Sequence, residues 1–116
     1  MQLLTKALIK RFQEVGSQER NPDPLVIARF FLPEGAATWY ATEYNSEGCV
    51  FFGYVTLFGL GSIEDEWGSF SLDELLRIRG PVLRLPVERD RFFTEARFSV
   101  VMQHERFQNF KAGLFN

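Results

Sequence analysis

The sequence has few of the cysteine and histidine residues that form disulfides and many metal sites. It contains one cysteine, Cys49, and one histidine, His104. A single cysteine excludes an internal disulfide and a zinc site of several thiolates, and a single histidine excludes a two-histidine metal motif. No apolar run approaches the roughly 20 residues that cross a membrane, and no signal peptide is evident. We therefore expect a cytoplasmic protein with no membrane partner.

An excess of positive charge is also lacking. The 116 residues include 13 Lys or Arg and 15 Asp or Glu, which gives a formal net charge of −2 at pH 7. A protein that binds duplex nucleic acid needs a concentrated basic face, because it must displace counterions from the phosphates. We therefore expect no duplex nucleic acid among the partners.

The apolar content, in contrast, is sufficient for a core. Hydrophobic residues make up 46% of the chain and aromatic residues 16%, with 13 phenylalanines. A chain of this length fits one domain, and we find no repeat, low-complexity tract or internal boundary. The sequence therefore predicts a single domain over residues 1–116 that folds without disulfide, metal or other cofactor.

A helix with clear boundary signals is predicted in the middle of the chain. The Ser71 hydroxyl can accept from the Glu74 backbone N–H, and the Glu74 carboxylate can reach back to the Ser71 N–H. Gly80 suits a left-handed residue just past a helix end, and the proline that follows it cannot continue a helix. This capping box and stop predict a helix over residues 71–79.

Alternating apolar residues and turn signals predict strands elsewhere. The expected strands are 25–32, 38–44, 50–58, a fourth around Trp67 and Phe70, and a fifth at 83–87, before a charged turn at 88–91. Two more helices are expected. One is capped by Thr5 and ended by Gly16, and the other lies near the C-terminus with Ser99 or Thr94 as its cap.

The links between the first three strands are too short for crossover connections, so these strands should form an antiparallel meander. The predicted fold class is α+β. It consists of an antiparallel sheet of four to five strands with two to three helices packed on one face.

Six motifs spread over nearly the whole chain match a known family. The sequence resembles the bacterial and phage family called domain of unknown function 2958 in Leu3–Lys6, Phe31–Gly35, Thr38–Glu43, Phe52–Gly53, Gly68–Leu75 and Leu85–Asp90. The resemblance implies a small cytoplasmic protein of the kind often carried by plasmids, phages or other mobile elements. It implies no activity, because none is established for the family.

One candidate polar site comprises Glu43, Glu88, Arg89 and Asp90. Strand alternation would place Glu43 on the same face as Trp39, where a buried carboxylate needs a partner. We expect Glu43 to be largely buried and to pair with Arg89, a bidentate partner for carboxylates. Convergence of Glu43, Glu88 and Asp90 on a hard cation is the alternative, although no spacing motif indicates a metal.

The candidate binding aromatics are Trp39, Tyr40 and Trp67. Aromatic side chains on an open sheet can stack unpaired bases, but they more often pack against helices in a core. No nucleophile motif, phosphate-binding glycine loop or dinucleotide fingerprint is present, and no catalytic residue is assigned.

The leading hypothesis is a non-enzymatic module that binds a protein partner in a mobile-element or phage context, as a monomer or homodimer. A small metal-dependent hydrolase using the carboxylates is the alternative, and a single-stranded nucleic-acid binder comes third.

The capping box gives a first testable prediction. Ser71→Ala should lower the free energy of unfolding by about 1 kcal/mol, because the side-chain acceptor at the helix start is lost. Ser71→Asp keeps a capping oxygen and should retain most of the stability. Denaturant unfolding of the two variants and the parent chain provides the measurement, and equal stability of all three would contradict a cap at this position.

Overall fold

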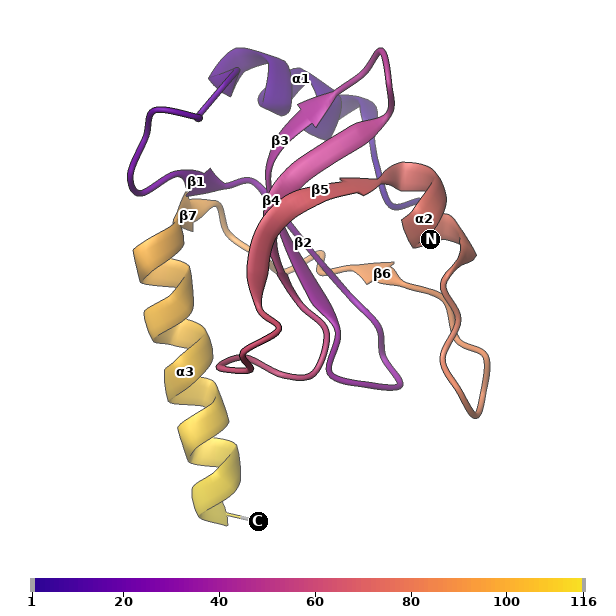
Figure 1. Ribbon diagram of the computed structural model, residues 1–116, viewed down its shortest axis with the longest axis vertical. Helices are drawn as coiled ribbons and strands as arrows, with labels where there is room; N and C mark the ends of the chain where they lie inside the picture. Colours follow the sequence, from indigo (N-terminus) through magenta and orange to yellow (C-terminus); the bar gives the residue numbers. More distant parts are fainter. Residues whose placement is uncertain (1, 116) are drawn as a thin grey trace.

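The computed structural model describes residues 2–115, and the side chains of residues 2–111. Within these residues the elements in chain order are α1 (Lys6–Val15), β1 (Leu25–Val26), β2 (Ala28–Phe31), β3 (Thr38–Asn45), β4 (Val50–Thr56), β5 (Glu66–Ser71), α2 (Leu72–Arg77), β6 (Glu88–Arg89), β7 (Ala96–Arg97) and α3 (Phe98–Phe115). Five strands form an antiparallel sheet in the order β5-β4-β3-β2-β6, and β1 pairs with β7 (Figure 1). The predicted α+β class and antiparallel sheet are confirmed. No helix within residues 2–115 is long and apolar enough to cross a membrane.

The meander of β2, β3, β4 and β5 follows the predicted order, and each strand pairs with the next. The predicted strand at 25–32 is divided, however. Val26 pairs with Ala96 of β7, whereas Ala28 pairs with Ala41 of β3. The division falls at Ile27, whose N–H donates to the Ala41 carbonyl at 2.9 Å. One apolar run therefore supplies strands to two sheets.

Two of the helices cover one face of the five-stranded sheet. Thr5 caps α1 by accepting from the Leu8 N–H at 3.2 Å, and Gly16 ends the helix with a φ of 68°. The buried core on this face combines side chains of α1 and α2 with those of the sheet; it includes Phe12, Leu75, Phe30, Trp39, Phe51 and Phe70. The predicted first helix, with its cap at Thr5 and its end at Gly16, is confirmed.

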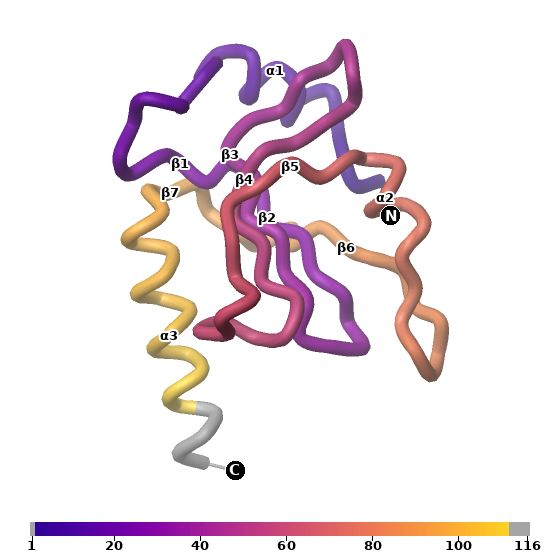
Figure 2. Tube along the Cα trace, in the orientation of Figure 1, coloured from indigo at the N-terminus to yellow at the C-terminus, as the bar shows by residue number. Residues whose placement is uncertain are grey.

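The third helix packs on the opposite face. Neighbouring strand residues point to opposite sides of a sheet, and Tyr40, next to Trp39, packs with Val101 and Met102 of α3. The expected cap at Ser99 or Thr94 is wrong, because α3 already begins at Phe98. The hydrogen-bond acceptor for the first turn of α3 comes from the segment before β1, which lies beside the start of this helix (Figure 2).

Asp23 supplies that partner from the loop of residues 16–24. Its carboxylate accepts the Ser99 N–H at 2.8 Å and the Ser99 hydroxyl at 2.6 Å. These hydrogen bonds lower the pKa of Asp23 below its usual value. A carboxylate at a helix start is also favoured by the helix dipole. The N-terminus of α3 is thus capped by a residue 76 positions away in sequence.

The boundaries around α2 differ from the prediction at its C-terminal end. The Glu74 N–H donates to the Ser71 hydroxyl at 2.9 Å, which confirms the cap, but the helix ends at Arg77 because Ile78 is extended. Gly80 is not left-handed. A Cβ at Gly80 would instead collide with the side chain of Glu34, so glycine is needed there for close approach.

The expected strand at 83–87 is also not formed. The Glu34 carboxylate accepts backbone N–H groups of this segment, from Val82 at 3.0 Å, Leu83 at 2.7 Å and Leu85 at 3.0 Å. Those donors are therefore not available to a sheet. The edge strand β6 forms at Glu88–Arg89, inside the region expected to be a solvated charged turn.

The Glu34 hydrogen bonds give the second prediction. They lower the pKa of Glu34, so the stabilisation is fully present above the usual carboxyl pKa and is lost as the pH falls through the lowered value. Backbone amide NMR shifts of Val82, Leu83 and Leu85 should therefore titrate together, with a midpoint below the usual carboxyl pKa. Glu34→Gln should abolish this common transition, and Glu64→Gln, in a different loop, should leave it unchanged. Independent midpoints for the three amides would contradict a shared anchor.

Candidate functional site

A β-bulge in β3 determines the geometry of the site. The pairing with β4 shifts between Ala41, which lies opposite Gly53, and Glu43, which lies opposite Phe52. A bulge places one extra residue in a strand and interrupts the alternation of faces. The extra residue is Thr42, whose hydroxyl donates to the Phe52 carbonyl at 3.1 Å. Glu43 therefore leaves the face of the sheet that carries Trp39.

The loop of residues 16–24 is fixed over this bulge by the buried side chain of Gln18. Its Nε2 donates to the Leu25 carbonyl at 2.9 Å and to the Thr42 carbonyl at 2.8 Å, and its Oε1 accepts from the Leu25 N–H at 2.7 Å. The Gln18 backbone N–H donates to the Glu43 carboxylate at 3.2 Å. One amide side chain thus joins the loop to β1 and β3.

An aromatic cluster lies beside the loop. Trp67 of β5 is near-parallel to Phe52 of β4, with ring centroids 6.2 Å apart, and both side chains are 39% exposed. Tyr54 and Phe98 also pack against the indole, at centroid distances of 5.3 and 4.7 Å. The indole is therefore fixed in place while part of its surface faces solvent.

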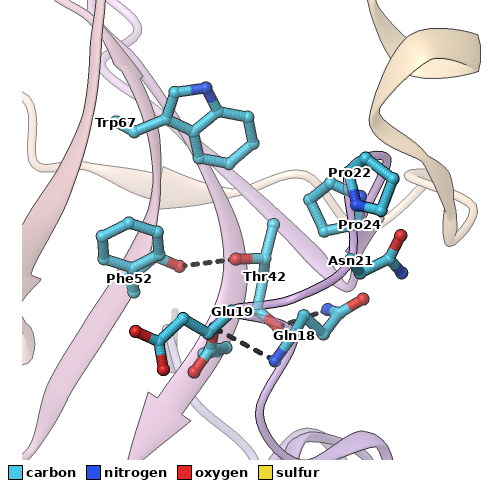
Figure 3. Close-up of a pocket in the computed structure, with 9 residues that line it drawn as sticks. Gln18, Glu19, Asn21, Pro22, Pro24, Thr42, Phe52 and Trp67 are labelled. Carbon is cyan, nitrogen blue, oxygen red and sulfur yellow. Dashed lines mark hydrogen bonds between the residues drawn. The ribbon is translucent and has the colours of Figure 1, made fainter.

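The loop, the bulge and the aromatic cluster line an open groove of about 510 Å³. Figure 3 shows Trp67 and Phe52 on one side and the prolines of the loop on the other. The lining residues are Gln18, Glu19, Asn21, Pro22, Pro24, Thr42, Glu43, Phe52 and Trp67. The charged members of this set are the two carboxylates. The groove thus offers aromatic surface and negative charge to a ligand.

The predicted pair of Glu43 with Arg89 is wrong. Arg89 lies on β6 opposite Phe30, and its Nη1 donates to the carbonyls of Gln2 at 3.0 Å and Leu3 at 3.4 Å. Glu43 is half-buried rather than largely buried, and it lies on the far side of the bulge, away from Trp39. The prediction assumed unbroken alternation along β3, which the bulge at residue 42 removes.

The other two candidate carboxylates do not join Glu43. Glu88 lies opposite Phe31 in the sheet, and Asp90 forms an ion pair with Arg29 at 3.4 Å. Within the described residues, no group of three or more His, Cys, Asp and Glu side chains could hold a metal ion. The expected convergence of Glu43, Glu88 and Asp90 is therefore not observed.

The three candidate aromatics have different environments. Trp39 is 4% exposed and Tyr40 is 2% exposed, in the cores on the two opposite faces of the sheet. Both residues lie on the central strand β3, so helices or loops cover both faces there. Trp67, on the edge strand β5, is the member of this trio that lines the groove.

A polar network joins α3 to the sheet. Arg29 pairs with Asp90 at 3.4 Å and with Glu105 of α3 at 3.2 Å, and its guanidinium lies 5.9 Å from the centre of the Tyr40 ring. Burial, and then the nearby Glu105 carboxylate, raises the pKa of Tyr40 to about 12. Tyr40 is therefore a neutral, buried contributor to packing between the sheet and α3.

Sequence reasoning missed most of the groove residues. Glu19, Pro22 and Pro24 belong to a polar, proline-containing stretch that predicts only a loop, and Gln18 carries no local signal of its buried role. Two prolines close together do restrict backbone freedom, which was the available sign that this loop is ordered. The bulge that brings the loop and the strand together has no comparable sign in the sequence.

The Gln18 contacts give the third prediction. Gln18→Ala removes the side-chain amide that donates to the Thr42 and Leu25 carbonyls and accepts from the Leu25 N–H. Leaving buried polar groups unsatisfied costs about 1–3 kcal/mol. The free energy of unfolding should fall by about that amount in denaturant melts. Gln13→Ala, an exposed glutamine on α1, is the control and should change stability by less than about 0.5 kcal/mol. Equal effects of the two substitutions would show that the Gln18 hydrogen bonds contribute nothing specific.

Comparison with known proteins identifies the family of the chain but no individual relative. Neither the curated proteins nor the solved structures include a significant relative of the chain. The family described as "Protein of unknown function (DUF2958)" matches residues 2–108, which is nearly the whole chain and agrees with the resemblance seen in its motifs. The chain therefore belongs to the DUF2958 family.

Proposed function

We propose that the chain is a non-enzymatic protein-interaction module of a bacterial mobile element or phage, and that the groove beside Trp67 is its binding surface. The observation that supports this most directly is the indole of Trp67, which is held by Tyr54 and Phe98 while 39% of its surface is exposed. Tryptophan is among the residues most enriched at the energetic centres of protein interfaces.

The groove has the rigidity that a binding surface benefits from. Gln18 fixes one end of the 16–24 loop to β1 and β3, and Asp23 fixes the other end to α3. A preorganised surface loses little conformational entropy when a partner binds, so more of the contact free energy appears as affinity. These contacts favour recognition by a formed groove over folding upon binding.

A single-stranded nucleic acid fits this groove less well. Trp67 and Phe52 could stack bases, but Glu19 and Glu43 line the same groove and would repel phosphates. A protein partner carries no such obligatory negative charge. The proposed setting is the bacterial cytoplasm, which agrees with what the resemblance of the motifs implies and with the single cysteine.

The fourth prediction tests the groove as the binding surface. Affinity capture from the native host with the parent chain should retain a partner that Trp67→Ser loses, as measured by quantitative mass spectrometry. Ile63→Ser is the control, because Ile63 is 98% exposed on the loop between β4 and β5 and does not line the groove. Far-UV circular dichroism of both variants checks that the fold is retained.

Two results would contradict the proposal. Retention of the same proteins by Trp67→Ser and the parent chain would exclude the groove as the binding surface. Equal losses with Trp67→Ser and Ile63→Ser would show that the capture depends on general surface hydrophobicity rather than on the groove.

A further inference from the structure

The groove carries negative charge without a positive counterpart. Among the residues that the structure describes, Glu19 and Glu43 line the groove and no Lys or Arg does. The ion pairs within the described residues involve other carboxylates. The Glu43 carboxylate accepts a hydrogen bond from the Gln18 backbone N–H at its Oε2. A carboxylate beside partly buried apolar surface is stabilised when a cation binds next to it.

The aromatic wall is complementary to the same kind of ligand. Cations are attracted to the faces of aromatic rings, most strongly to tryptophan. The cation–π contacts within the described residues involve Phe31, Tyr40 and Phe107, and neither Trp67 nor Phe52 is among them. Both of these rings are part-exposed in the groove, so a cation from outside can reach them.

We propose that the groove binds an arginine side chain from an extended segment of the partner protein. This inference rests on the proposed function, since it identifies what the interaction module recognises. A guanidinium group is planar, so it can stack on the Trp67 or Phe52 ring while donating to a carboxylate at its edge. A lysine ammonium can form a cation–π contact but lacks the planar fork, and an anionic ligand would face Glu19 and Glu43.

The dimensions and the opposite wall agree with an extended segment. The groove volume of about 510 Å³ lies within the roughly 300–1,000 Å³ typical of ligand pockets, which is enough for one large side chain with its flanking backbone. Pro22 and Pro24 form an apolar wall across from the aromatic rings, against which neighbouring aliphatic residues of the segment can pack (Figure 3). The anchored 16–24 loop keeps the two walls apart before binding.

The fifth prediction uses two short peptides with blocked ends that differ at one position, arginine in one and citrulline in the other. Citrulline has nearly the same shape but no charge. The arginine peptide should shift the Trp67 indole N–H resonance saturably, while the indole of the buried Trp39 serves as an internal reference. The citrulline peptide should bind about tenfold more weakly or worse, because charge pairing and cation–π attraction are both lost. The arginine affinity should also fall as salt is added.

Variants of the protein separate the contributions of the two groove carboxylates to arginine binding. Glu43→Gln keeps an oxygen that can accept from the Gln18 N–H, so it should weaken arginine binding several-fold without unfolding the loop. Glu19→Gln provides a second test at an exposed position with little structural role. Glu64→Gln is the charge-matched control outside the groove and should leave the affinity unchanged.

Each contrary outcome is distinct. Equal affinity for the arginine and citrulline peptides, or insensitivity to both groove carboxylates, would overturn recognition of a cation. A Trp67 shift that depends on protein concentration without peptide would identify a second copy of the chain as the occupant and overturn the proposal. If neither peptide binds although Trp67→Ser still loses a captured partner, the arginine inference fails and the proposed function stands; if that capture is also unaffected, both fail.

Discussion

The buried amide of Gln18 is the interaction on which the arrangement of the candidate site depends. It reaches the backbone of Leu25 and of Thr42 at the same time, so it fixes how far the 16–24 loop lies from the sheet. Within a protein interior, backbone groups without partners are costly, and here a single side chain satisfies three of them. The groove between the loop and the aromatic cluster exists because this distance is fixed.

The second constraint is the bulge at Thr42. A strand with unbroken alternation would turn Glu43 toward the face that carries Trp39 and Phe51, where α1 covers the sheet. The extra residue turns Glu43 toward Phe52 and the groove, and it also aims the Thr42 carbonyl at Gln18. The acidic character of the groove therefore follows from a backbone irregularity as much as from the identity of the side chain.

The parts of the fold that could be predicted from sequence are those governed by local rules. The caps at Thr5 and Ser71, the end of α1 at Gly16 and the order of the meander depend on residues close together in the chain. Two of the misses involve distant partners. Glu34 accepts N–H groups that would otherwise be available to a strand after Gly80. Asp23 caps α3, for which the sequence predicts a local cap at Ser99 or Thr94.

The candidate site was predictable only in part for the same reason. Trp67 and Glu43 were identified as candidates by residue type, but their grouping was not, because it requires the bulge and the loop together. Arg89, which charge pairing suggested as the partner of Glu43, instead donates to the backbone near the N-terminus. Complementary charge in a sequence indicates which pairs are possible, and strand register decides which of them can meet.

Because of the hydrogen bonds between Ser99 and Asp23, the 16–24 loop belongs both to the groove and to the N-terminal cap of α3. The loop that closes the groove also provides the acceptors for the first turn of α3. Displacement of the loop would leave the Ser99 donors of α3 without partners. The free energy needed to displace the loop therefore includes the cost of fraying the first turn of α3. By thermodynamic reciprocity, a contact made on α3 that resists fraying also favours the anchored position of the loop, and a contact that holds the loop in place also favours the ordered first turn of α3.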